Sequence, residues 1–199
     1  MLDAAKEIFE ENGFLEARIS DIAERAGLSH GSFYHYFESK EEIFREVAKE
    51  QENQLSSHCV VDSGLVDVST DTTMRERLEE SVRRFLTDYR DEAGIMGVIE
   101  QVSRYDEQVR TARVAQQAPY TEQTEDAIRY LQRHGLADEH LDPVIAASAL
   151  AAMVSRFAEM WFVQGMLDCA FEKGVDQLTS LCINALQLEN RPPGRRRSG

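Results

Sequence analysis

The sequence predicts an all-α protein. Apolar residues recur at helical spacing in nearly every segment, and the alternation of apolar and polar residues that marks strands is almost absent. Helix start signals separate these segments, such as Ser39 three residues before Glu42 and Pro143 directly after Asp142. Hydrophobic residues make up 42% of the 199 residues, which is enough to bury the core of one large domain or of two smaller ones.

Four short helices are predicted within the first 48 residues. Gly13 follows the first at a position typical of a C-terminal cap, Ser29 can cap the third, and Ser39 begins the fourth. Each helix has one apolar face. These faces are Leu2, Ala5, Ile8 and Phe9 in the first helix, Ile22, Ala23 and Ala26 in the second, Phe33 and Phe37 in the third, and Ile43, Phe44 and Val47 in the fourth.

Longer helices are predicted after residue 48. Residues 57–72 are rich in Ser, Thr, Val and Asp, so we expect a loop or a frayed helix end there. A long helix starts at Thr72 or Thr73, Gly94 and Gly97 interrupt it, and a short helix follows. The next helix covers about 106–134, and a proline at position 119 should kink or break it. The apolar side of the first of these helices is Leu78, Val82, Phe85, Leu86 and Tyr89.

The most apolar helix is expected from Pro143 to about Gln164, because Asp142 can cap it and proline suits the first helical position. A loop over residues 165–174 leads to a last helix of about 175–188. The basic end of the chain, residues 191–199, is expected to be disordered. A single undivided bundle is the alternative to two domains.

The charge of the chain is unusual for a protein that binds nucleic acid. The net charge is −14, and residues 1–50 hold 6 Lys and Arg against 12 Asp and Glu, a balance of −6. Contact with phosphates normally requires a basic face. DNA binding would therefore depend on a few well-placed cations and on uncharged donors, and its salt dependence should be shallow.

Several classes of protein are disfavoured by the sequence. No apolar run approaches the about 20 residues of a membrane helix, and acidic residues at Asp3 and Glu7 argue against a signal peptide, so we expect a cytoplasmic protein without a membrane partner. Cys59, Cys169 and Cys182 form no CxxC pair, so neither a zinc site nor a disulfide framework is expected. Since no nucleophile–base pair, metal spacing or phosphate loop is found, we expect no enzyme, no metal and no cofactor.

Residues 22–37 carry the most informative pattern, a short helix, a glycine turn and a second short helix. Ala23 is small where two helices must cross, Gly27 can adopt the left-handed backbone of the turn, and Leu28 can pack into the corner. The second helix carries histidines, serines and tyrosines, whose side chains can bond to phosphates and base edges. The pattern predicts a helix-turn-helix over about residues 18–37, and hence a DNA-binding regulator.

The runs Leu2–Phe9, Asn12–Phe14, Asp21–Gly27 and Ser32–Lys40 closely resemble the DNA-binding domain of the TetR family of transcriptional regulators. This resemblance covers about residues 2–48. It implies an N-terminal three-helix helix-turn-helix domain in residues 1–48, a helical ligand-binding and dimerisation bundle in residues 49–190, and a disordered basic tail in 191–199. Residues 153–163 also resemble, more weakly, the penultimate helix of many actinobacterial-type members.

The resemblance implies a set of DNA-binding residues. His30 and Ser32 fall where family members touch base edges; Tyr34, His35 and Tyr36 fall where phosphates or thymine methyl groups are met; Lys40 falls on a phosphate contact. Arg18 stands where many members have a capping Thr, so we expect it to bind a phosphate or the minor groove, with the second helix starting near Ser20. Tyr34 as a packing residue and His35 as a merely solvated one are the alternatives. The full set is Arg18, Ser20, Ser29, His30, Gly31, Ser32, Tyr34, His35, Tyr36 and Lys40.

The resemblance also implies a homodimer on a palindromic DNA operator and a small apolar or amphipathic effector, with a repressor as the expected function. The dimer would form through helices of about 143–164 and 175–188. For the Met and aromatic residues of the first of these helices, a dimer seam, a ligand pocket and a plain core compete. The candidate pocket is Phe85, Tyr89, Met96, Ile99, Tyr120, Met153, Phe157, Met160 and Trp161. The alternative function is a protein of the same fold with weak or lost DNA binding, which binds a ligand or another protein.

Overall fold

The computed structural model describes residues 1–56 and 72–188, and every regular element within them is a helix, which confirms the all-α prediction. Contacts divide the chain into two compact units. The first contains residues 1–56 and 91–117, and the second contains the described parts of 57–90 and 118–199. The elements are α1 (Leu2–Glu16), α2 (Ile19–Arg25), α3 (His30–Phe33), α4 (Lys40–Ser56), α5 (Met74–Asp91), α6 (Ala93–Ser103), α7 (Glu107–Arg133), α8 (Pro143–Ala158), the π-helical turn η2 (Glu159–Val163) and α9 (Phe171–Leu186).

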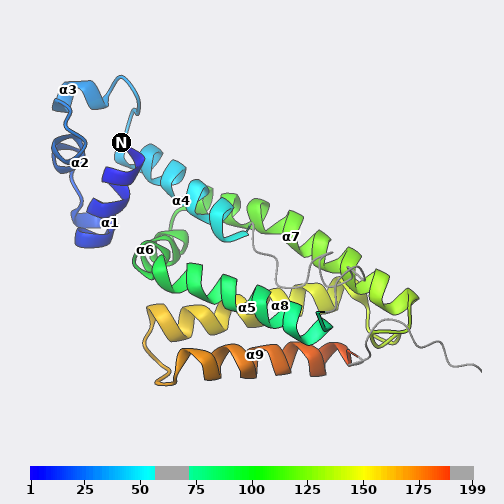
Figure 1. The fold of residues 1–199 in the computed structure, drawn as a ribbon. Coiled ribbons are helices and arrows are strands. Elements are labelled where there is room, and N and C mark those ends of the chain that lie inside the picture. The colour runs from blue at the N-terminus through cyan, green and yellow to red at the C-terminus, as the bar shows by residue number, and fades with distance from the viewer. Residues whose placement is uncertain (57–71, 189–199) are drawn as a thin grey trace, which may run out of the picture. The chain divides into compact units, whose positions relative to one another are not determined.

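The core of the first unit is built around α1, which packs against α2, α4 and α6 (Figure 1). Phe9 and Phe44 meet edge to face with ring centroids 5.0 Å apart, and Phe14 contacts both rings. Ile22 and Phe33 are fully buried and join α2 and α3 to this core. Most of the predicted apolar faces are therefore buried, while Leu2, Ala26 and Phe37 are only partly so.

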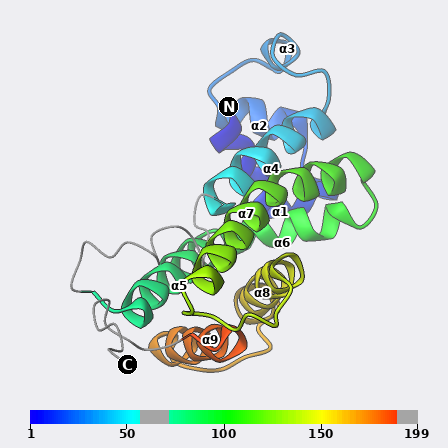
Figure 2. The same ribbon diagram turned by 90° about the vertical axis from the view of Figure 1, so that its right-hand side faces the viewer.

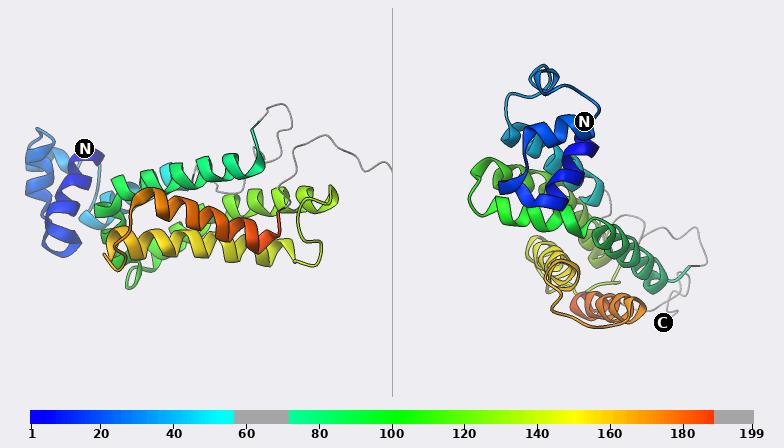
Figure 3. Two further views of the ribbon diagram at one scale, coloured as in Figure 1. Left: turned by 60° about the horizontal axis from the view of Figure 1, so that its bottom comes forward. Right: turned by 90° about the vertical axis from the view of Figure 1, so that its left-hand side faces the viewer.

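In the second unit, α5, α8 and α9 lie side by side, as Figures 1 and 3 both show. The buried face of α5 consists of Leu78, Val82, Leu86 and Tyr89, all among the predicted apolar positions. Two ion pairs join α5 to α9, Arg75 to Asp176 at 2.6 Å and Arg83 to Glu172 at 2.6 Å. Figure 2 views α8 and α9 nearly end-on and α5 obliquely.

The predicted helix starts are confirmed where a side chain caps the backbone. Ser29 accepts a hydrogen bond from the amide of Ser32 at 3.1 Å. Thr73 and Glu76 form a reciprocal capping box at the start of α5. Asp142 accepts from the first two free amides of α8, with Pro143 at the first position. These bonds join residues two or three positions apart, which is why the sequence reveals them.

The capping box at the start of α4 differs in one bond from the prediction. Ser39 accepts from the amide of Glu42 at 3.1 Å, as expected. The carboxylate of Glu42 accepts from the amide of Glu38, one residue before the cap, instead of from Ser39. The predicted end of the first helical stretch at Gly13 is confirmed, because Gly13 has a non-helical backbone with φ of 71° and ψ of 167°. The helix kinks there and then resumes, so α1 as a whole continues to Glu16.

Three glycine predictions were wrong. Gly94 and Gly97 lie inside α6, and the break after α5 falls at Glu92. A Cβ on Gly94 would lie 3.2 Å from the carboxylate of Glu10, so this glycine permits close approach to α1. Gly174 lies inside α9, which begins at Phe171, four residues before the predicted start.

The predicted break at Pro119 is wrong, because α7 runs through this proline from Glu107 to Arg133. The alternative, a kink, stays a prediction. Asp106 caps α7 by accepting from the amides of Gln108 and Val109, and Gly135 follows with φ of 67°. The loop expected over 57–72, apart from residue 72 itself, lies outside the described residues, as do the basic tail of 191–199 and Cys59.

Candidate nucleic-acid interface

The turn between α2 and α3 has the geometry that the helix-turn-helix pattern predicts. Gly27 has φ of 70°, the left-handed backbone that glycine adopts without steric cost. The amide of Leu28 donates to the carbonyl of Ala23 at 2.8 Å, which closes the turn. Ala23 itself is 1% exposed. The small side chain therefore lies at the helix crossing, as its position in the sequence suggested.

Arg25 fixes α2 against α1. Its guanidinium donates to Glu7 at 2.7 Å and to Glu11 at 2.8 Å. The hydrogen bond to Glu11, followed by that to Glu7, raises the pKa of Arg25 further above its usual range, and the bond from Arg25 lowers the pKa of Glu11. Since this cation is held by two carboxylates, it adds little positive charge for DNA.

The tip of the motif exposes aromatic and imidazole side chains. Figure 2 shows α3 standing out from α1, α2 and α4, joined by a connection on each side. Tyr34 is 51% exposed and Tyr36 is 65% exposed, although tyrosine usually buries its ring. His30 and His35 are also exposed. The helix has only four residues, so Tyr34 to Tyr36 belong to the turn that follows α3.

Packing orients part of this tip. The Phe33 ring is fully buried and contacts Tyr34 edge to face, with centroids 5.5 Å apart. The other side of Tyr34 meets His30 at 5.4 Å. His30, predicted to contact base edges, and Tyr34, predicted to contact phosphates or thymine methyl groups, therefore lie side by side, and Tyr34 packs on the buried ring of Phe33. The exposed ring of Tyr34 weakens the alternative in which it is a packing residue.

The two serines of α3 are partly used by the fold. The hydroxyl oxygens of Ser29 and Ser32 are 2.7 Å apart, and Ser29 also caps the helix. Gly31 lies between them, and a Cβ added there would meet only the Ser29 hydroxyl oxygen within 4 Å, at 3.9 Å. The fold therefore leaves room for a larger side chain at Gly31 and does not itself require glycine there.

The start of α2 differs from expectation. Arg18 is the N-cap residue, in extended backbone, and α2 begins at Ile19, one residue before the predicted Ser20. The hydroxyl of Ser20 donates to Asp21 at 2.9 Å. The side chain of Arg18 makes no capping bond and is exposed. Exposed acidic residues Glu16 and Glu24 lie near it in the sequence.

Lys40 has a role that the sequence did not suggest. Its ammonium donates to the carbonyl oxygens of Phe14 at 2.7 Å, Leu15 at 3.0 Å and Ala17 at 2.9 Å. It also lies 4.8 Å from the centroid of the Phe14 ring. An ammonium has three donors, and here all three bond to backbone carbonyls. In this conformation Lys40 has no donor left for the predicted phosphate contact.

The candidate pocket residues fall into both compact units. Met96 and Ile99 are buried in the first unit, 3% and 0% exposed. The second unit contains an aromatic cluster around Trp161, in which Phe162 stacks at 4.5 Å and Phe157 meets it edge to face at 5.5 Å. The other candidates in the second unit are Phe85, Tyr89, Tyr120, Met153 and Met160.

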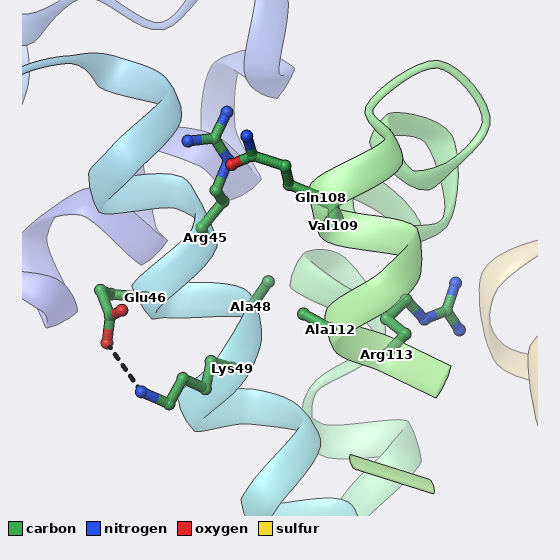
Figure 4. Close-up of a pocket in the computed structure, with 8 residues that line it drawn as sticks. All are labelled: Arg45, Glu46, Ala48, Lys49, Gln108, Val109, Ala112 and Arg113. Atoms are coloured by element: carbon green, nitrogen blue, oxygen red, sulfur yellow. Dashed lines mark ion pairs between the residues drawn. The ribbon is translucent and has the colours of Figure 1, made fainter. Parts of the chain in front are cut away.

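A hollow of about 120 Å³ lies between α4 and α7 in the first unit (Figure 4). Its floor is apolar, and Lys49 pairs with Glu46 at its edge, 3.5 Å apart. Arg113 points away from it in Figure 4 and pairs with Glu100 at 2.8 Å. Burial is the largest single influence on Glu100 and would raise its pKa, but the hydrogen bonds and charges of Arg113 and Arg104 together outweigh burial and lower the pKa. The lining is Arg45, Glu46, Ala48, Lys49, Gln108, Val109, Ala112 and Arg113, with no member of the predicted pocket.

The helices predicted to form the dimer carry exposed apolar side chains. The stretch Pro143–Val163 has a mean hydropathy of 1.3, and by length and composition alone it could cross a membrane. Only 22% of its most apolar part is buried within the structure. Ile145 is 70% exposed on α8, and Leu181 is 52% exposed on α9. Leaving this apolar surface exposed to water is unfavourable in free energy, which is typical of a surface that another protein or ligand covers.

Comparison with known sequences links the first unit to DNA-binding proteins. The family described as bacterial regulatory proteins, tetR family, matches residues 1–47. The fatty acid metabolism regulator protein of Bacillus subtilis is 33% identical over 78 residues, 39% of this chain and 38% of that protein, so the match spans less than half of that regulator. The HTH-type transcriptional regulator YdgC of the same organism is 29% identical over 174 residues, 85% of this chain and 83% of that protein.

Solved structures share the fold over nearly the whole chain. A TetR-family transcriptional regulator from Mesorhizobium loti superposes with a TM-score of 0.73 and 21% identity, covering 92% of this chain and 93% of that one. FadR from Bacillus subtilis, solved in complex with stearoyl-CoA, gives a TM-score of 0.69 and 20% identity, covering 92% and 96%. At these identities the likeness is one of fold.

Proposed function

The chain belongs to the TetR family of transcriptional regulators, and we propose that it is a repressor that binds a palindromic operator as a homodimer and leaves it when a small apolar or amphipathic effector binds. The exposed tip of the helix-turn-helix carries this proposal. An acidic protein that exposes His30, Tyr34 and Tyr36 around a glycine has the uncharged donors that groove and phosphate contacts use.

The roles at the DNA follow from chemistry. His30 and Ser32 would read base edges, since imidazole and hydroxyl groups can donate or accept in the major groove. The hydroxyls of Tyr34 and Tyr36 would donate to phosphates, and Arg18 would supply a cation. His35 would meet a phosphate, and Gly31 would let the backbone approach. Ser20 and Ser29 complete the proposed set, with Ser29 acting through the cap that orders the start of α3.

The dimer would form through α8 and α9. Ile145 and Leu181 lie on exposed surfaces of these helices, and pairing two copies around a two-fold axis would remove their apolar area from water. A symmetric dimer would place two recognition segments about 34–36 Å apart, one turn of DNA. Because of this spacing, we expect a palindromic operator. A regulator that binds the chromosome must also be cytoplasmic, so we propose this location.

The effector is proposed from the aromatic cluster and from the relatives. Trp161, Phe157 and Phe162 provide apolar and polarisable surface in the second unit. One relative is a fatty acid metabolism regulator and one structural neighbour was solved with stearoyl-CoA, so a long-chain acyl thioester is a suitable first probe. The probe can release DNA only to the extent that it binds the DNA-free conformation more tightly.

Fluorescence anisotropy with a duplex selected by the full-length protein from random-sequence DNA tests the proposal. We expect saturable binding that Tyr34→Phe weakens, because a phosphate donor is lost. Tyr105→Phe is the matched control, since Tyr105 is 56% exposed but lies after α6. Stearoyl-CoA should then displace the duplex.

Failure of the selection to enrich any duplex would favour the alternative, a protein of this fold that binds a ligand or a protein partner. The charge of −6 over residues 1–50 supports this alternative. Equal loss in both tyrosine variants would refute the proposed role of the tip. Binding to DNA without release by stearoyl-CoA would refute this effector and leave the operator in place.

A further inference from the structure

Lys40 is the first residue of α4 and lies against the end of α1. Its ammonium nitrogen is within 3.0 Å of three backbone carbonyl oxygens, those of Phe14, Leu15 and Ala17. Its side chain is partly buried, and the nitrogen lies 4.8 Å from the centre of the Phe14 ring. Both the donors and the charge are therefore occupied by the protein itself.

These carbonyls need a donor for a reason built into helices. The last carbonyls of a helix have no amide partner within it, and they carry the negative end of the helix dipole. A lysine ammonium supplies three donors and a positive charge at once. The ring of Phe14 adds a cation–π contact on the apolar side. The arrangement is an end cap for α1 donated from a distant helix.

The position of this cap in the chain gives it a second consequence. Ala17 lies just before α2, and Lys40 begins α4, the next helix after α3. One side chain thus ties together the two ends of the segment that contains α2, the turn and α3. We propose that Lys40 is a positioning residue, which holds the DNA-reading segment in its binding conformation, and that it does not neutralise a DNA phosphate. This inference rests on the DNA binding proposed above.

The two roles differ in their salt dependence. A cation that neutralises a phosphate releases counterions, so its loss lowers the slope of log affinity against log salt by about 0.9 per contact, or about 1.8 for both protomers. A positioning residue acts by ordering the free protein before it binds. Its loss should therefore weaken binding by a similar factor at every salt concentration.

The experiment compares Lys40→Met with Arg18→Met in the full-length protein. Methionine keeps the stem over Phe14 but removes the donors, and Arg18 is an exposed cation at the N-cap of α2. Binding to the selected duplex is measured across salt, at a temperature where circular dichroism shows each variant to be fully folded. We expect Lys40→Met to lose about tenfold affinity with an unchanged slope, because bonds to a charged group that order the site are lost. Arg18→Met should reduce the slope.

Hydrogen exchange and a conservative variant provide the remaining outcomes. In Lys40→Met, amides of α2 and α3 should exchange faster than those of α9. Lys40→Arg keeps the charge, but a planar guanidinium cannot direct three donors at the same three carbonyls. The affinity of Lys40→Arg for the duplex should therefore be several-fold lower than that of the wild type. If Lys40→Met does not fold, Lys40→Arg is the variant that tests the proposal. Full affinity in Lys40→Arg, or a reduced slope in Lys40→Met, would overturn the proposal. If the wild-type protein selects no duplex, the proposed function fails, whereas faster exchange in α2 and α3 would still show the tie.

Discussion

Replacing Gly174 with alanine should place a methyl group against the ring of Trp161. A Cβ built on Gly174 lies 2.3 Å from both the Cη2 and the Cζ3 atoms of Trp161. Carbon atoms in contact are ordinarily about 3.5–4.0 Å apart, so the overlap exceeds 1 Å by this measure. The close packing of α9 on η2 therefore depends on a residue without a side chain at this position.

The indole ring has little freedom to move aside. Trp161 is 9% exposed and stacks on Phe162 at 4.5 Å and 18°, while Phe157 meets it at 5.5 Å. Overpacking of this kind costs about 1–3 kcal/mol. An overlap of more than 1 Å belongs to the upper part of this range, about 2–3 kcal/mol. Since alanine regains about 1 kcal/mol in a helix interior, the net loss is on the order of 1–2 kcal/mol. For a chain of this length that lowers Tm by roughly 2–8 °C.

Thermal unfolding followed by circular dichroism measures this loss. Trp161 is the only tryptophan in the sequence, so its emission reports the same site. Gly31→Ala is the matched control, because its Cβ would meet no atom closer than 3.9 Å, and its Tm should not fall. A Gly174→Ala variant with the wild-type Tm and unchanged emission would refute the packing argument.

Three further predictions concern other contacts. Ile145→Glu should turn a dimer into a monomer in light scattering, because it charges an apolar side chain that is 70% exposed in one copy; Val114→Glu, on an exposed valine of α7, is the control, and equal masses for both variants would contradict the α8 interface. Asp142→Ala should lower the free energy of unfolding by about 1 kcal/mol, since the cap of α8 is lost; no change in denaturant midpoint would argue against the cap. Arg25→Met should remove a pH-dependent part of the stability, because Arg25 lowers the folded pKa of Glu11 below 4.5. The wild type should therefore be more stable than the variant above about pH 4.5 and should lose this advantage as the pH falls through the folded pKa of Glu11. An advantage that persists at low pH would contradict the role of the Arg25–Glu11 pair.

Local capping could be predicted from the sequence because its partners are neighbours. Ser29, Thr73 and Asp142 each bond to an amide two or three residues ahead, so identity and spacing are sufficient. The left-handed turn at Gly27 was predictable for the same reason. These residues define the starts of α3, α5 and α8 and the turn between α2 and α3.

Contacts between distant residues were not predictable. Gly94 and Gly174 were interpreted as breaks, but each permits the approach of a side chain from another helix, Glu10 and Trp161 respectively. Lys40 was assigned to a phosphate because backbone carbonyls, which it in fact bonds, leave no sequence signature. In these three cases the deciding partner lies 13 or more residues away.

Helical periodicity also did not separate the candidate pocket residues. Met96 and Phe85 both occupy apolar positions of their helices, yet Met96 belongs to the first compact unit and Phe85 to the second. The period identifies which side chains face inward but not which unit they join. The assignment of either residue to an effector pocket therefore stays a prediction.

The central claim is that the exposed tip around His30 and Tyr34 reads an operator, although the protein is acidic. Competition between the selected duplex and a scrambled duplex of the same composition tests it most directly, with the mass of the complex measured in parallel. The account predicts two chains per duplex and a preference of about a thousandfold or more for the selected sequence. Equal affinity for the two duplexes would contradict it, because the structure would then lack the sequence reading that its tip is proposed to perform.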